Sequence, residues 1–137
     1  MTYPIHGYRS GPRVIVPMPV DASSADIKPG DMIGQSQTDG YATQAAAGNK
    51  IIGFAVSLVD NPTADGGATV MVDTSRESIY EYPPDAGSVT QAIVGDLLDV
   101  GGAQSIDIDA TVDNALECVR VDVDANTCFV KRNASLE

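Results

Sequence analysis

The chain has 137 residues, a length that suits one domain with a core of moderate size. Its formal net charge is −11 with only eight Lys and Arg, which argues against a nucleic-acid partner, because phosphate contacts need clustered basic side chains. No apolar run approaches the about 20 residues that a membrane helix needs. We therefore expect neither nucleic acid nor membrane as a partner.

Thirteen Gly and eight Pro favour many short strands and turns over long helices. The chain holds no Trp, so aliphatic residues must fill most of the core, with Phe54 and Phe129 as its largest apolar side chains. The two cysteines are expected to be reduced thiols, as in a protein made in a cytosol.

The first thirteen residues hold two Pro and two Gly and predict an extended arm, ordered only where something holds it. This segment is basic and rich in Tyr, whereas the rest of the chain is strongly acidic. Tyr and Arg are favoured where protein surfaces meet. The residues that we predict to contact a partner are Tyr3, Tyr8, Arg9 and Arg13.

Val14 to Val20 predicts a strand that must lie at a sheet edge or along a neighbouring chain, because Pro17 and Pro19 cannot sit in the middle of a sheet. After the turn at Pro29-Gly30-Asp31, two strands are predicted at 32–36 and 41–47. The Asp39-Gly40 pair between them is a strong hairpin signal.

The stretch from Lys50 to Tyr82 predicts three strands in a row, a β meander. Apolar residues alternate along the first strand, which is the pattern of a half-buried strand. Turn residues at 60–67 separate it from a second strand, Ala68 to Asp73. The third strand, Ser78 to Tyr82, ends at Pro83-Pro84, which cannot donate to a sheet.

The C-terminal part predicts a strand or a single helical turn at 89–94, strands at 97–100 and 105–110, and a hairpin of 116–123 with 127–131. If the turn centres on residue 125, Asp122 lies opposite Cys128. Cys118 then lies near Arg132, and the two thiols are too far apart for a disulfide.

The sequence therefore predicts an all-β domain, a small barrel or sandwich. Residues 1–20 form the arm and edge strand, 21–132 the β domain, and 133–137 a tail. A weak internal repeat indicates two similar β units: Gly30-Asp31-Met32-Ile33 matches Gly95-Asp96-Leu97-Leu98 at an offset of 65 residues. At the same offset Phe54 falls on Val119.

Few patterns point to chemistry, and we expect no enzyme, no metal and no cofactor. Asp73-Thr74-Ser75 after an apolar strand is similar to the catalytic loop of retroviral-type aspartic proteases. However, too few residues separate this loop from the next matching segment to form the flap hairpin that such enzymes need. Asp122, Asp124 and Asn126 match the first positions of an EF-hand loop, yet the flanks are strands. His6, the single His, lies in the arm.

The order of parts resembles the small decoration, or cement, proteins of tailed-bacteriophage heads. The matching segments are the proline-containing strand at 14–19, Ile27-Lys28-Pro29-Gly30-Asp31, the strand at 48–55, the acidic Gly-Gly turn, Val70-Met71-Val72-Asp73, Gly95-Asp96-Leu97-Leu98 and the final hairpin. The resemblance implies a compact β fold, often a homotrimer. It also implies binding to the major capsid protein on the outer surface of an assembled head, through an arm that here holds Tyr3, Tyr8, Arg9 and Arg13.

We therefore expect a structural decoration protein made in the host cytoplasm and carried on the virion. Deleting residues 1–13 is expected to leave the fold intact and to weaken binding to the shell. The first alternative is a carbohydrate- or receptor-binding β module that uses loops at 61–67 and 103–114. The second is the aspartic protease.

Overall fold

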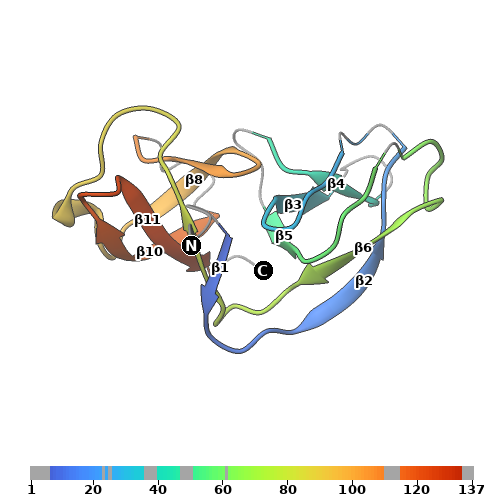
Figure 1. Ribbon diagram of the computed structural model, residues 1–137, viewed down its shortest axis with the longest axis horizontal. Coiled ribbons are helices and arrows are strands. Elements are labelled where there is room, and N and C mark those ends of the chain that lie inside the picture. Colours follow the sequence, from blue (N-terminus) through green and yellow to red (C-terminus); the bar gives the residue numbers. More distant parts are fainter. Residues whose placement is uncertain are drawn as a thin grey trace, which may run out of the picture.

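The computed structural model describes residues 7–22, 24, 26–35, 40–46, 51–60, 62–109 and 115–133. Two antiparallel sheets, neither closed into a barrel, hold nearly all of the regular structure (Figure 1). The all-β prediction is therefore confirmed. A 3-10 turn at Gln91–Ile93 is the one helical element among these residues, in the segment where a strand or a single turn was expected.

Sheet A and sheet B lie side by side (Figure 1). Sheet A has six strands in the spatial order β1 (Gly7–Ser10), β7 (Ile79–Tyr82), β11 (Thr127–Arg132), β10 (Leu116–Asp122), β8 (Leu97–Gly102) and β9 (Ser105–Asp107). Sheet B has five strands in the order β2 (Ile15–Pro19), β6 (Thr69–Asp73), β5 (Ile51–Ala55), β3 (Met32–Gln35) and β4 (Ala42–Gln44).

The central stretch is not the meander that the sequence predicted. β5 pairs with β6 as expected, but β7 leaves them and pairs with β1 and β11 in the other sheet. The period-two pattern identifies a strand without naming its partner, which explains the error. The alternation of apolar residues also continues in the sequence beyond the end of the strand. β5 ends at Ala55, and Leu58, which continues the alternation, is exposed.

The two sheets repeat one five-stranded unit. We call β2 to β6 repeat 1 and β7 to β11 repeat 2. Numbered along the chain within each repeat, the strands lie in the spatial order first, fifth, fourth, second, third in both sheets, and every neighbouring pair is antiparallel. This shared order confirms the prediction of two similar β units.

Equivalent backbone contacts strengthen the match between the repeats. A parallel bridge joins Val20 to Ala42 in repeat 1 and Pro84 to Ile106 in repeat 2. Each bridge is followed by a 2.8 Å hydrogen bond, from the Asp21 amide to Ala42 or from the Asp85 amide to Ile106. These bridges link the two outer strands of each unit, so each sheet curls around its own interior.

The Gly-Asp motif plays the same part in each repeat. Gly30 and Gly95 both have φ near +90° (92 and 91), which favours glycine. Gly30 donates to the Ala55 carbonyl at 2.9 Å, and Gly95 donates to the Cys118 carbonyl at 2.7 Å. Ala55 is therefore equivalent to Cys118.

By the same correspondence Phe54 aligns with Glu117, two residues away from the predicted Val119. The reason is that repeat 2 is one residue shorter in the hairpin of its second and third strands, and one residue shorter between its third and fourth strands.

The two repeats have matching interiors that differ in size. The buried cluster of repeat 1 contains Val20, Ile27, Ile33, Ala42, Ala55, Val59, Val70 and Val72. The second cluster combines the interior of repeat 2 with four side chains of repeat 1: Met32, Ala45, Ile51 and Phe54. Repeat 1 therefore completes the core of repeat 2.

An aromatic stack joins the repeats, and composition alone did not predict it. The Phe54 ring lies on the Tyr80 ring with centroids 3.8 Å apart and planes 13° apart. Tyr82 continues the stack, with its centroid 6.2 Å from Phe54. All three side chains are buried. Phe129 is also buried, as predicted, and lies beneath the Arg120 guanidinium, whose carbon is 3.9 Å from the ring centroid.

The predicted separation of the cysteines was wrong. Asp122 lies opposite Thr127 and not Cys128, and a bulge between Cys118 and Arg120 places Cys118 opposite Val130. Both residues are buried free thiols, and their side chains interact. A hydrogen bond with Cys118, together with burial, raises the pKa of the Cys128 thiol.

Replacing the shared aromatic ring tests the contact between repeats. Phe54→Ala is expected to lower the free energy of unfolding by about 3–5 kcal/mol, because it opens a cavity against Tyr80. Urea denaturation followed by tyrosine fluorescence measures the change. Val123→Ala, at an exposed apolar position, is the control and should change stability by less than about 0.5 kcal/mol. A loss for Phe54→Ala as small as that of the control would contradict the packing.

The correspondence between repeats also predicts which residues can replace the thiols. Cys118 and Cys128 take the places of Ala55 and Val70. The double variant Cys118→Ala, Cys128→Val should therefore keep the fold and lose at most about 1.5 kcal/mol, since it adopts side chains that the other repeat packs at the same positions. Thermal unfolding measures this loss. The reference variant Leu98→Ala, at a buried position, should lose about 2–5 kcal/mol.

Candidate functional site

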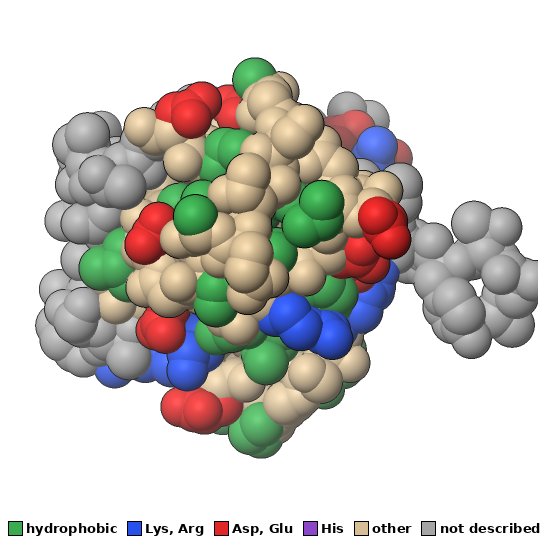
Figure 2. Space-filling view, turned by 90° about the vertical axis from the view of Figure 1, so that its left-hand side faces the viewer, with side chains coloured by type: hydrophobic (Ala, Val, Ile, Leu, Met, Phe, Trp, Pro, Cys, Tyr) green, Lys and Arg blue, Asp and Glu red, His purple; other side chains and the backbone are tan. Residues whose placement is uncertain are grey.

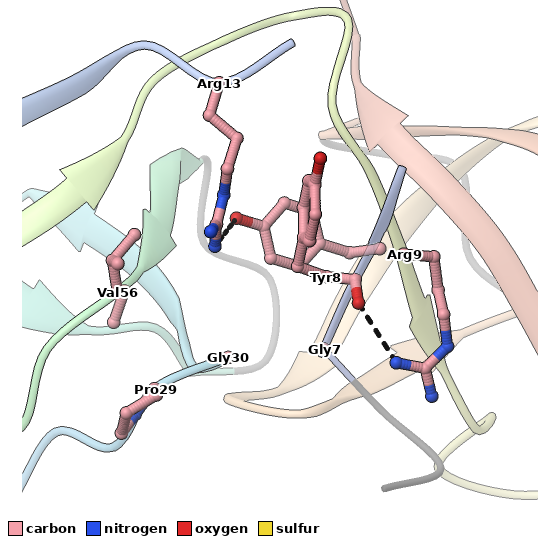
Figure 3. A pocket seen from close by; sticks show the side chains of 9 residues that line it. Gly7, Tyr8, Arg9, Arg13, Pro29, Gly30 and Val56 are labelled. Atoms are coloured by element: carbon pink, nitrogen blue, oxygen red, sulfur yellow. Dashed lines mark hydrogen bonds between the residues drawn. The ribbon is translucent and has the colours of Figure 1, made fainter. Parts of the chain in front are cut away.

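The predicted contact residues meet in a cleft at the junction of the two repeats (Figure 3). The cleft has a volume of about 280 Å³. Its lining residues are Gly7, Tyr8, Arg9, Arg13, Pro29, Gly30, Ala55, Val56 and Tyr80. Three of the four predicted residues are therefore brought together, and Tyr3 lies outside the described residues.

The predicted free arm is held by its own chain over its second half. β1 pairs antiparallel with β7, with Gly7 opposite Glu81 and Tyr8 opposite Tyr80. Gly11 then turns the chain at φ +93°, close to the backbone of Glu77. Residues 7–13 thus belong to the folded body. Deleting residues 1–13 is now expected to destabilise it, because the deletion uncovers one side of β7.

Arg13 reaches across the cleft and contacts both tyrosines. Its guanidinium carbon lies 4.0 Å from the centre of the Tyr8 ring, and an Nη2 group donates to the Tyr80 hydroxyl at 3.3 Å. The Tyr8 ring in turn meets the Tyr80 ring edge to face, with centroids 5.6 Å apart. Hydrogen bonding to Tyr80 helps to raise the pKa of Arg13 against the opposing effect of burial. Arg13 therefore stays charged throughout the stable pH range.

Asp73 anchors this group of side chains from beneath. Its carboxylate is fully buried and accepts hydrogen bonds from the Tyr80 hydroxyl at 2.8 Å and from the Val14 and Ser75 amides at 3.1 Å. Arg13 lies 3.5 Å from the same carboxylate. Burial by itself would raise the pKa of Asp73, but these hydrogen bonds outweigh it and hold the pKa below its ordinary value.

Arg9 is also paired within the chain. Its Nε donates to Glu81 at 2.7 Å, and an Nη1 group donates to the Tyr8 carbonyl at 3.0 Å. With Arg13 beside Asp73, the two cations of the cleft are balanced by two carboxylates. The cleft therefore offers the Tyr8 ring and the Arg side chains to a partner without a strong positive field.

An apolar strip extends from the cleft along the outer face of sheet B. Val56, which lines the cleft, donates its amide to the Met71 carbonyl, and Met71 lies opposite Pro17. Met71 is 36% exposed, and Ile15 on the same strand as Pro17 is 44% exposed. We call Tyr8, Arg9, Arg13, Ile15, Val56 and Met71 the cleft face. Rings and Arg beside exposed apolar side chains are typical of protein contact surfaces.

The structure adds no support for a metal site at the acidic hairpin. Within the described part of the chain, no three His, Cys, Asp or Glu residues lie together as metal ligands. Asp122 caps its own turn by accepting from the Ala125 amide, and the Asn126 side chain bonds to residues 87 and 89. His6 lies outside the described residues.

Both loops of the binding-module alternative make hydrogen bonds to other parts of the chain. Asp65 accepts a 2.9 Å hydrogen bond from the Ala22 amide. In the second loop, the Ala103 carbonyl accepts from the Met32 amide at 2.8 Å, and Gln104 donates to Asp31 at 2.6 Å. Asn61 and residues 110–114 lie outside the described residues.

No helix among the described residues has the length and apolar character to span a membrane. No protein-family model matches the chain, and neither the curated proteins nor the solved structures contain a match to it.

Removing the charge of Asp73 tests the anchor of the cleft. Asp73→Asn should lower the free energy of unfolding at neutral pH by about 2–3 kcal/mol, because an amide cannot replace the buried carboxylate beside Tyr80 and Arg13. Since the folded-state pKa of Asp73 is depressed, its stabilisation is present above the unfolded-state pKa and is lost as the pH falls through the folded-state pKa. The gap between wild type and variant should therefore narrow below about pH 4.

Urea denaturation at a series of pH values measures this gap. Asp124→Asn, at an exposed turn position, is the control and should change stability little at any pH. A gap between wild type and Asp73→Asn that stays constant down to about pH 2 would show that the ionised carboxylate is not what stabilises the site.

Proposed function

We propose that this protein is a capsid decoration protein that binds the outside of an assembled phage head and stabilises contacts between major capsid proteins. The observation that carries the proposal is the cleft face: one ring and two Arg from the N-terminal segment, continued by exposed Ile15 and Met71. The resemblance in the order of turns and strands points to the same role.

The charge of the protein limits the partners that its surface can bind. With a net charge of −11, the protein repels nucleic acid and other acidic surfaces. On the end of the molecule seen in Figure 2, acidic side chains are spread among apolar and polar ones, and most of the basic side chains lie in separate groups on its lower half. Many copies on one shell would add weak individual contacts into strong overall binding.

The cleft lining offers an adhesive surface rather than a reactive one. Among its described lining residues, no nucleophile lies beside a general base. Asp73, the residue on which a protease would depend, is fully buried and hydrogen bonded within one chain, which favours a structural role for it. A carbohydrate- or receptor-binding module remains the alternative, and a glycan array tests it.

Co-sedimentation with empty phage heads tests the proposal. Wild-type protein should pellet with assembled heads and not with unassembled capsid subunits. Met71→Asp and Ile15→Asp should each weaken head binding at least about tenfold, which corresponds to about 1.4 kcal/mol, because each places a charge in the apolar strip.

Val123→Asp is the matched control, since Val123 is an exposed apolar residue in the β10–β11 turn, away from the cleft face. It should bind heads like wild type. The point variants also replace the deletion of residues 1–13, which removes β1 and so mixes folding with binding. Equal binding by all four proteins would refute the assignment of the cleft face.

A further inference from the structure

The inner face of the first strand is covered in repeat 2, whereas the equivalent face in repeat 1 is partly exposed. Tyr80 and Tyr82 lie at the mouth of the repeat 2 interior and are almost completely buried, because Phe54 and the segment around Gly30 cover them. The strand register makes Val16 and Met18 their equivalents in repeat 1. Val16 is 36% exposed and Met18 is only partly buried.

The covering surface shows the opposite pattern. In repeat 1 it consists of Asp31, Met32 and Phe54, all of them buried against repeat 2. Their equivalents in repeat 2 are Asp96, Leu97 and Glu117. Asp96 is exposed, and the other two are partly exposed.

Each chain therefore exposes the equivalents of both sides of its internal junction, one on repeat 1 and the other on repeat 2. We propose that a second copy of this chain docks its Asp96, Leu97 and Glu117 on Val16 and Met18, repeating between chains the contact that joins the two repeats within a chain. The internal junction supplies the template, because the same backbone positions already meet there. Glu117 then lies over Val16, as Phe54 lies over Tyr80, with its strand neighbour Leu97 beside it.

This contact uses side chains and not an added strand. The Val14 carbonyl accepts from Thr74, and the Val20 amide donates to Ala68, so the even-numbered residues of β2 point their backbone groups toward β6. Pro17 and Pro19 therefore occupy outward-pointing positions, where they offer no N–H to a further strand. β1 pairs with the outer edge of β7, whereas the two prolines prevent a further strand from pairing with the equivalent edge of β2.

The chemistry of the outer face makes the contact between chains weaker than the one within a chain. Glu117 stands where Phe54 supplies the aromatic stack, and Asp96 stands where Asp31 is paired with Gln104. The assembly should therefore depend on concentration. Since the two surfaces differ, the contact is heterologous and closes into a ring when its rotation permits.

Mixing two variants that each gain one surface cysteine tests which surfaces meet. One chain carries Val16→Cys and the other carries Leu97→Cys, and the native thiols stay buried in both. After mild oxidation, non-reducing electrophoresis should show a mixed Val16–Leu97 dimer at least about tenfold above either homodimer. Homodimers as abundant as the mixed product, or no product at all, would overturn the proposal.

Sedimentation velocity over a range of concentrations provides the second readout. Wild type should associate, and Val16→Asp and Leu97→Asp should each remain monomeric with an unchanged thermal midpoint. Val123→Asp should associate like wild type. A wild-type chain that stays monomeric at every concentration overturns the inference. None of these residues belongs to the cleft face, so failure here is distinct from failure to bind heads.

Discussion

The structure depends on one contact, the Phe54 ring of repeat 1 lying flat on the Tyr80 ring of repeat 2. Each curled sheet is small, and burying these rings between the sheets extends the core of repeat 2 into repeat 1. Tyr80 then connects this core to the surface. Its ring packs on Phe54, and its hydroxyl donates to the buried Asp73 carboxylate.

The cleft is a consequence of that junction. Because Asp73 holds Tyr80 and lies beside Arg13, the segment after β1 is drawn over the seam between the repeats. Tyr8 completes the wall by meeting Tyr80 edge to face. A surface built on the rigid seam of two sheets is pre-organised, which lowers the entropic cost of binding a partner.

The two repeats share a fold and differ where contacts with other molecules are proposed. β7 accepts β1 along its outer edge, whereas Pro17 and Pro19 keep the equivalent edge of β2 bare. The aromatic position of the junction, Phe54, becomes Glu117 in the second repeat. Similar interiors with divergent edges are the pattern expected when a duplicated unit keeps its packing and changes its partners.

Local sequence patterns predicted most strands, because turn residues bound them and proline marks an edge. They did not predict that β7 belongs to the other sheet, since alternation carries no information on pairing. They missed the bulge that brings the two cysteines together, and they missed Tyr80 and Tyr82 as core residues. The repeat was visible from Gly30 and Gly95 because a positive φ constrains the residue type.

The cleft was found only in part. Tyr8, Arg9 and Arg13 were selected for their residue types in a basic segment, but the carboxylates that pair with them lie more than fifty positions away in sequence. Folding brings these groups together, so no local spacing could reveal that the arm is held by its own chain.

Calorimetry of the native protein is the most direct test of the central claim that the two repeats form one cooperative body. A shared core predicts a single thermal transition whose calorimetric enthalpy equals its van't Hoff enthalpy. Two resolved transitions, or a calorimetric enthalpy about twice the van't Hoff value, would show that the repeats unfold independently and would contradict the account.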